Sequence, residues 1–217
     1  MKERRPVSGN EPVFRKIYRT NRWGSAESVS GPGAELRQTR KVRQAIARVL
    51  MQHGIRTAVD AGCGDFNWMR HVRGVNELDW YEGLDIVPDL IEHNQRRYGN
   101  GRIRFRRADI TRDELPTADL VICRDCMVHL STPDVAALLD SVKHSGSRYL
   151  LATTYPQVTD NRDTADGQWR PLNLQAPPFS LPEPVEFIDT DFTDNGRYHP
   201  GNGLGLWHLT PDEPTTP

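Results

Sequence analysis

The segment VDAGCGDFNWM, residues 59–69, joins an apolar stretch to a turn in which two aspartates bracket two glycines. Gly62 and Gly64 let the backbone approach a ligand closely, because neither residue carries a side chain. An anionic diphosphate would lie between Asp60 and Asp65 without a compensating base, and Asn67 stands where a dinucleotide-binding turn has its third glycine. The turn therefore favours a ligand with positive charge and no phosphate.

Polar side chains also follow the next three apolar segments. Asp85 follows WYEGL, Asp109 follows IRFRRA, and Arg124 and Asp125 follow ADLVIC. Ligands of open parallel sheets bind outside the carboxyl ends of the strands, so we expect these side chains at one site. A helix cap or turn explains any single aspartate equally well, but three after successive strands favour a ligand. S-adenosylmethionine (SAM) suits such a site, because it has a ribose that needs an acid partner, a sulfonium and an ammonium group.

The elements that must position these residues follow from the apolar periodicity. Helices are expected over 35–53, 66–72, 88–99 and 131–146. At the start of the last helix, Ser131 and Asp134 have the spacing of a capping box. Strands are expected over 55–62, 80–86, 103–110, 118–123, 148–154, 185–189 and 205–209. This alternation predicts an α/β fold with a doubly wound, seven-stranded sheet, mostly parallel, with an antiparallel hairpin at one edge.

Composition adds to this outline. Residues 1–34 contain the glycine- and serine-rich WGSAESVSGPG, and we expect an irregular lid or substrate loop ahead of one domain over 35–217. No apolar run is long enough for a membrane span or a secretory signal, and three cysteines do not suggest disulfides. Cys123 and Cys126 form C-x-x-C without a second pair, so packing thiols are expected. The sequence predicts a cytoplasmic protein and leaves a homodimer open.

The turn and the residues after the strands resemble the class I SAM-dependent methyltransferases. The motifs D-A-G-C-G-D, G-L-D-I, A-D-I and D-L-V-I-C-R-D occur in order within residues 35–155. The resemblance implies that Asp85 binds both ribose hydroxyls, that Asp109 accepts from the adenine amino group, and that Asp60 lies near the methionine tail. The cofactor-binding residues that it implies are Asp60, Gly62, Gly64, Asp85, Ile86, Asp109, Ile110 and Arg124.

The chain also resembles a family of small bacterial methyltransferases, through WGSAESVSGPG, CGDFNWM, CRDCMVHLS and WRPLNLQAPPF. One member of that family is the mycobacterial 1-O-methyltransferase of methylmannose polysaccharide synthesis. The resemblance implies methyl transfer to a hydroxyl of a sugar, for instance the 1-hydroxyl of a 3-O-methylated mannoside, or of a similar small metabolite.

Two residues are candidates for the base that removes the acceptor proton. Asp125 is the second residue past the fourth strand, where side chains of this fold face the transferred methyl group, and a SAM-contacting or capping role is equally consistent. His129 lies four residues further along, at the start of a helix, and could instead pack there. His144 is expected at the far end of that helix and is not a candidate.

Acceptor contacts are expected from irregular segments. Aromatic and guanidinium groups suit a polyhydroxylated acceptor, although such residues in loops more often anchor the loop. The candidates are Trp23, Tyr155, Trp169 and Arg170, with Tyr18, Ser25, Thr154 and Asn173 nearby. Asp163, Asp166 and Asp125 could hold Mg²⁺, but no ordered D-x-D-x-D loop is present, so the metal requirement stays open.

The alternatives concern the acceptor. The net charge is −1, and the first 56 residues carry 13 Lys and Arg against 4 Glu. These basic residues are spread along a helix face, so nucleic-acid binding is not the favoured interpretation. Methylation of RNA or of a small amine nitrogen would favour an N-P-P-Y clamp, and the chain has R-D-C-M instead. A SAM-binding module without turnover remains the third alternative.

Overall fold

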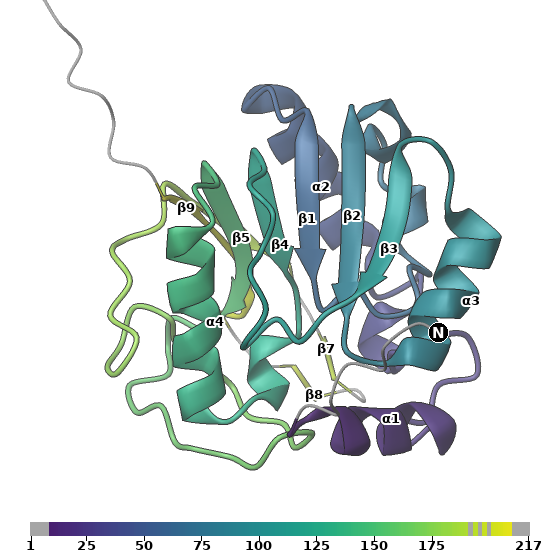
Figure 1. Ribbon diagram of the computed structural model, residues 1–217. Helices are drawn as coiled ribbons and strands as arrows, with labels where there is room; N and C mark the ends of the chain where they lie inside the picture. Colours follow the sequence, from purple (N-terminus) through teal and green to yellow (C-terminus); the bar gives the residue numbers. More distant parts are fainter. Residues whose placement is uncertain (1–8, 191–192, 195–196, 199–200, 210–217) are drawn as a thin grey trace, which may run out of the picture.

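The computed structural model describes residues 9–190, 193–194, 197–198 and 201–209. The helices are α1 (Glu11–Arg19), α2 (Arg40–Gln52), α3 (Pro88–Tyr98) and α4 (Thr132–His144). The strands are β1 (Thr57–Ala61), β2 (Trp80–Asp85), β3 (Ile103–Arg107), β4 (Leu120–Cys123), β5 (Tyr149–Thr154), β6 (Glu186–Asp189), β7 (Thr193–Asp194), β8 (Arg197–Tyr198) and β9 (Gly203–His208). Figure 1 shows the carboxyl ends of β1, β2 and β3 pointing toward α1.

In the described part of the chain, seven strands form one sheet in the order β3-β2-β1-β4-β5-β9-β6. β1 to β5 pair in parallel, whereas β9 runs antiparallel between β5 and β6. β4 is buried along its whole length, as expected of an apolar strand that is covered on both faces. The doubly wound fold with an antiparallel edge hairpin, as predicted from the sequence, is confirmed.

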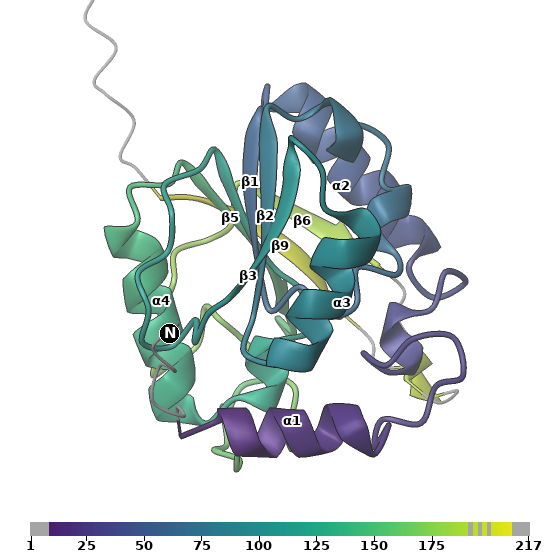
Figure 2. The same ribbon diagram turned by 45° about the vertical axis from the view of Figure 1, so that its right-hand side comes forward.

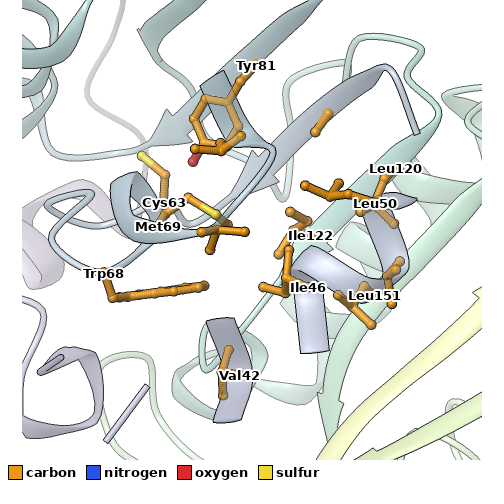
Figure 3. Close-up of a cluster of buried hydrophobic side chains, with 14 of the residues drawn as sticks. Val42, Ile46, Leu50, Cys63, Trp68, Met69, Tyr81, Leu120, Ile122 and Leu151 are labelled. Atoms are coloured by element: carbon orange, nitrogen blue, oxygen red, sulfur yellow. The ribbon is translucent and has the colours of Figure 1, made fainter. Parts of the chain in front are cut away.

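One face of the sheet is covered by α2 and α3 and the opposite face by α4 (Figure 2). Val42, Ala45, Ile46 and Val49 repeat at helical spacing along α2 and are all buried. Figure 3 shows part of this core, in which α2 meets Trp68, Met69 and Tyr81 as well as apolar side chains of the strands. This packing holds the residues around the glycine turn in place.

The irregular segment after β5 contributes to the second face. Leu172, Leu174, Phe179 and Leu181 pack in the same buried cluster as α4. Asn161 and Asn173 secure this segment: the Asn161 side-chain amide donates to the Asn173 carbonyl at 2.8 Å, and that of Asn173 donates to the Val158 carbonyl at 2.9 Å. Residues without regular structure thus do part of the covering that a helix would otherwise provide.

The N-terminal segment differs from the expectation of an irregular loop, because residues 11–19 form α1. A nine-residue helix has little stability of its own, and this one is held by tertiary contacts. Glu11 pairs with Arg107, the last residue of β3, and Arg15 and Arg19 pair with Asp89 of α3. The Asn10 side chain donates to Asp134 of α4. No helix in the described ranges is long and apolar enough to cross a membrane.

Three local expectations also need correction. α2 begins at Arg40 rather than at residue 35, and residues 66–72 contain only a 3₁₀ turn at Met69–His71. The Ser131 side chain does not cap α4. Instead, Asp166 and Asp163 accept from the backbone N–H groups of Ser131 and Thr132, each at 2.7 Å. These partners lie more than 30 residues further along the chain, where a local capping signal cannot reveal them.

Candidate active site

A cavity of about 440 Å³ opens at the carboxyl edge of the sheet. That size suits a small-molecule ligand. Its lining includes two groups of residues that we name for use below. The carboxylate wall follows β1, β2 and β3 and comprises Asp60, Gly62, Gly64, Asp85 and Asp109. The aromatic wall comes from segments far apart in the chain and comprises Trp23, His129, Gln168 and Trp169.

The glycine turn after β1 has the conformation that its sequence favours. Gly62 and Gly64 have φ angles of 85° and 57°, and a Cβ would collide with Cys126 Sγ at Gly62 and with the Ser30 hydroxyl at Gly64. Asp85 holds this turn, since its Oδ2 accepts from the Gly64 N–H at 3.1 Å and its Oδ1 from the Val87 N–H at 3.0 Å. Burial raises the pKa of Asp85, while these backbone hydrogen bonds oppose the shift.

Asp60 is the most enclosed carboxyl group of the carboxylate wall, with 3% of its surface exposed. Its Oδ2 accepts from the Tyr81 hydroxyl at 2.6 Å. Burial raises the pKa of Asp60 to about 7; the Tyr81 hydrogen bond opposes this shift, nearby Asp85 adds to it, and Arg124 lowers it. A cationic ligand group next to Asp60 would favour the ionised carboxylate.

Asp109 presents an acceptor that the protein leaves unsatisfied. Its Oδ1 accepts from the Thr111 N–H at 3.1 Å and hydroxyl at 2.7 Å. Its buried Oδ2 lies 3.7 Å from Arg112 Nε but accepts no hydrogen bond within the residues that the structure describes. Ile86 and Ile110 line the cavity with it. A buried acceptor without a donor is costly, so this place suits a flat ligand group that brings an N–H donor.

Arg124 and Asp125 form a fixed pair at the end of β4. The Arg124 guanidinium lies 5.2 Å from the Trp68 ring centre, donates to the Gly33 carbonyl at 3.0 Å and contacts Asp125 Oδ2 at 2.8 Å. The Thr153 hydroxyl donates to Asp125 Oδ1 at 3.1 Å and accepts from the Asp125 N–H at 2.9 Å. Asp125 has a φ of 51°, a strained backbone that this set of contacts maintains.

His129 has a defined tautomer. Its Nδ1 lies 3.1 Å from the Gln168 carbonyl oxygen, which can only accept, so Nδ1 carries the proton and the lone pair of the neutral ring is on Nε2. The ring lies 4.9 Å from that of Trp23, centre to centre, at an interplanar angle of 33°. The neighbouring backbone is also tied down, since the Gly167 N–H donates to the His129 carbonyl at 2.8 Å.

The four expected acceptor contacts divide into two pairs. Trp23 and Trp169 line the cavity, and Trp169 is 37% exposed. Tyr155 and Arg170 are buried and do not appear in the cavity wall. The Arg170 guanidinium donates to the backbone carbonyls of Arg162, Met127 and Val128, at 2.9, 3.2 and 3.3 Å. For this second pair, the structure favours the loop-anchoring alternative over acceptor contact.

Asp65 does not line the cavity, although the charge argument from the sequence used it. Its Oδ2 accepts from the Ser28 hydroxyl at 2.8 Å and the Val29 N–H at 3.0 Å, and its Oδ1 accepts from the Ser30 hydroxyl at 3.4 Å. Asp65 therefore anchors the N-terminal segment onto the glycine turn. The acidic character of the cavity comes from Asp60, Asp85, Asp109 and Asp125 instead.

The acids considered for Mg²⁺ are used elsewhere or lie apart. Asp163 and Asp166 hold the N-terminus of α4, and Asp125 is paired with Arg124. Among the described residues, no group of three or more His, Cys, Asp or Glu side chains could hold a metal ion. C-x-x-C contributes free thiols, with Cys123 buried and Cys126 partly buried against Gly62.

Sequence reasoning missed several cavity residues. Asn10 directly precedes α1 and Phe14 lies within it, and the sequence did not reveal this helix. Gln168 contacts His129 through its backbone carbonyl, for which side-chain type gives no signal. Trp68 stood within the quoted turn and could have been found, because a tryptophan next to a cavity-forming glycine turn is a natural partner for Arg124.

Comparisons with known proteins agree with this architecture. Residues 58–145 match the family described as methyltransferase domain. Among solved structures, magnesium protoporphyrin IX methyltransferase of Synechocystis PCC 6803 with bound SAM is 15% identical with a TM-score of 0.61, over 94% of this chain and 98% of that chain. N-methyltransferase NodS of Bradyrhizobium japonicum WM9 is 12% identical with a TM-score of 0.55, over 79% of this chain and 96% of that chain. No curated protein matches the sequence.

The strand order is that of the Rossmann-like methyltransferase fold, and the family match covers residues 58–145, less than half of the chain. Identities of 12% and 15% show this fold alone. The Synechocystis structure holds SAM, and the carboxylate wall of this chain has groups that suit such a ligand: a glycine turn without side chains, Asp85 held by backbone N–H groups, and Asp109 Oδ2, which accepts no hydrogen bond.

Proposed function

We propose that this protein is a SAM-dependent O-methyltransferase that acts on a hydroxyl of a sugar or a similar small metabolite. The observation that carries the proposal is the His129 imidazole, which has its lone pair on Nε2 and stacks on Trp23 in the wall of the same cavity as the carboxylate wall. A hydroxyl acceptor needs such a base, and aromatic side chains suit the apolar faces of a sugar ring.

The carboxylate wall would hold the cofactor. Asp85 is positioned by the Gly64 and Val87 N–H groups and would accept from the ribose hydroxyls. Asp109 Oδ2 would accept from the adenine amino group, with Ile86 and Ile110 beside the ring. Asp60 would pair with the ammonium group next to Gly62. Arg124 would act indirectly, through its contact with Asp125.

His129 is proposed as the base in preference to Asp125. The Asp125 carboxylate contacts Thr153 and Arg124, and the hydrogen bond from His129 Nδ1 to the Gln168 carbonyl makes Nε2 the basic nitrogen of the neutral ring. When bound, S-adenosylmethionine supplies a methyl group on a sulfonium that leaves as a neutral thioether. His129 takes the acceptor hydroxyl proton at Nε2, and Asp125, held in its strained backbone, orients the acceptor.

The N-terminal segment would serve as a lid and acceptor-binding element, with residues 1–8 of the expected 1–34 lying outside the described part of the chain. Trp23 and α1 contribute to the cavity wall, and Asp65 ties residues 28–30 to the glycine turn. Water exclusion by such a segment would protect the transferring methyl group.

The test is incubation of the protein with methyl-labelled SAM and a panel of acceptors. The panel contains mannosides, including 3-O-methylated ones with a free 1-hydroxyl, together with other sugars, small amines and RNA, each with and without EDTA. We expect label on a sugar hydroxyl and its loss in His129→Ala. Label on an amine or RNA would replace the proposed acceptor class, and SAM binding without transfer to any acceptor would indicate a binding module.

A further inference from the structure

Asp60 and Tyr81 form a buried acid–phenol pair beneath the glycine turn. Asp60 is at the carboxyl end of β1, and Tyr81 is fully buried on the adjacent strand β2. Gly83 pairs with Asp60 across the two strands, and Tyr81 lies two residues before Gly83, so both side chains emerge on one face of the sheet. Figure 3 shows the Tyr81 ring among apolar side chains, where its hydroxyl donates to Asp60 Oδ2 at 2.6 Å.

The charged and titratable neighbours of Asp60 come from three places. Asp85 ends β2, Arg124 follows β4, and Cys63 and Cys126 belong to the turns after β1 and β4. Burial raises the pKa of the Cys63 thiol and of the Tyr81 hydroxyl well above their usual range, and a hydrogen bond with Cys123 together with burial does the same for the Cys126 thiol. These groups therefore stay neutral near pH 7. Asp60, whose pKa is about 7, is therefore the group of this set that can change charge there, and the pKa of Asp85 is raised by burial as well.

We propose that Tyr81 is a positioning residue for cofactor binding: its hydrogen bond holds Asp60 as the ionised partner of the cofactor ammonium group. The inference rests on the proposed function, because it takes the cofactor to be S-adenosylmethionine. Tyr81 does not line the cavity and would act entirely through Asp60, whose carboxyl group does.

The expected pH dependence follows from which form of Asp60 binds. The pKa of Asp60 is raised to about 7, so below that pH a proton must leave before the ammonium group can pair with a carboxylate. SAM affinity should then fall by up to about tenfold per pH unit below pH 7 and level off above it. Tyr81 donates to the ionised form, and its removal raises the pKa of Asp60 further, which moves the fall in affinity to higher pH.

The experiment is calorimetric titration from about pH 5.5 to about pH 7.5, a range in which most of an α-amino group with a pKa of about 7.7–8.0 is still protonated. Wild type and Tyr81→Phe are titrated with SAM and with methylthioadenosine, which has the adenosine but no amino acid. A one-unit rise in the pKa of Asp60 weakens SAM binding about fivefold at pH 7 and less at higher pH. Methylthioadenosine has the ribose proposed to bind Asp85, so any titration of Asp85 would appear in its affinity. The pH dependence of its affinity should be the same for both proteins.

Two further variants keep the result interpretable. Tyr98→Phe removes a phenol outside the cavity wall and should reproduce the wild-type SAM profile. Asp60→Asn should bind SAM weakly, with the pH profile of methylthioadenosine. Coincident SAM profiles for wild type and Tyr81→Phe, or equal shifts for both ligands, would overturn the role of Tyr81. Absence of SAM binding to wild type at every pH would instead overturn the proposed function.

Discussion

The two walls of the cavity are built in different ways. Residues of the carboxylate wall lie at the carboxyl ends of parallel strands or within two or three residues after them, so each is close in sequence to the strand that positions it. The aromatic wall joins Trp23 from the N-terminal segment, His129 from the turn before α4, and Trp169 from the segment after β5. In the proposed function, cofactor binding thus depends on the sheet, and acceptor binding depends on how the irregular segments pack onto it.

The anchors of the two irregular segments differ as well. Residues 28–30 of the N-terminal segment are held by one carboxylate, Asp65, which accepts from hydroxyl and backbone donors of these residues. The segment after β5 is held by side chains that bind backbone carbonyls, above all Arg170 and Asn161. The residues proposed to contact the methyl acceptor lie on these two segments. Loss of a side chain that holds either segment should therefore disturb the aromatic wall more than the carboxylate wall.

The largest effect expected from this comparison is at His129. His129→Ala should lower the rate of methyl transfer by about 10²- to 10⁴-fold, because the acceptor proton loses its base, while SAM affinity stays unchanged. Single-turnover kinetics with an acceptor found in the panel, together with calorimetry, measure the two quantities. His144→Ala changes an imidazole that is 77% exposed on α4 and should leave both unchanged. Equal rates for wild type and His129→Ala would show that His129 is not the base.

Substitution in the carboxylate wall should lower SAM affinity, whereas substitution of His129 lowers the rate of methyl transfer. Asp85→Ala leaves ribose hydroxyls and the Gly64 N–H without their acceptor, which costs about 1–3 kcal/mol and weakens SAM binding by roughly 5- to 150-fold. Calorimetry measures this loss. Asp79→Ala removes an exposed carboxylate that pairs with Arg56 and serves as the matched control. Undiminished SAM affinity in Asp85→Ala would contradict the cofactor assignment.

Substitution of Asp125 tests whether this residue orients the acceptor, as proposed, or acts as the base. Asp125→Asn retains a residue type that tolerates a left-handed backbone but weakens the contact with Arg124. We expect a rate about tenfold lower, equivalent to about 1.4 kcal/mol, with SAM affinity preserved. A rate loss as large as that of His129→Ala would make Asp125 the better candidate for the base.

The smallest effect on chemistry is expected at Asp65. Asp65→Ala leaves the Ser28 hydroxyl and the Val29 N–H without their acceptor, and should lower the free energy of unfolding by about 1–3 kcal/mol. SAM affinity should fall by only a few-fold, since Asp65 does not line the cavity. Urea denaturation with and without SAM measures both, with the exposed Asp160→Ala as control. A stability equal to wild type would show that Asp65 is not an anchor.

Sequence reasoning identified most of the fold and all of the carboxylate wall. The strands were recognisable because apolar runs such as LVIC are buried from both faces, and the residues after them were expected at one edge because parallel strands align their carboxyl ends. It failed at α1, whose nine residues are stable only through partners such as Arg107 and Asp89, and at Asp65, whose partners lie more than 30 residues away.

By itself, then, the sequence determined the doubly wound sheet, the glycine turn and the row of acids beyond the strands, because each follows from residues that are neighbours in the chain. Only the tertiary structure decided which loop residues face the cavity. It brought Trp23 and Trp169 to His129, turned Arg170 toward backbone carbonyls, and joined Tyr81 to Asp60. Such contacts depend on long-range packing and on backbone acceptors, for which residue type carries no local signal.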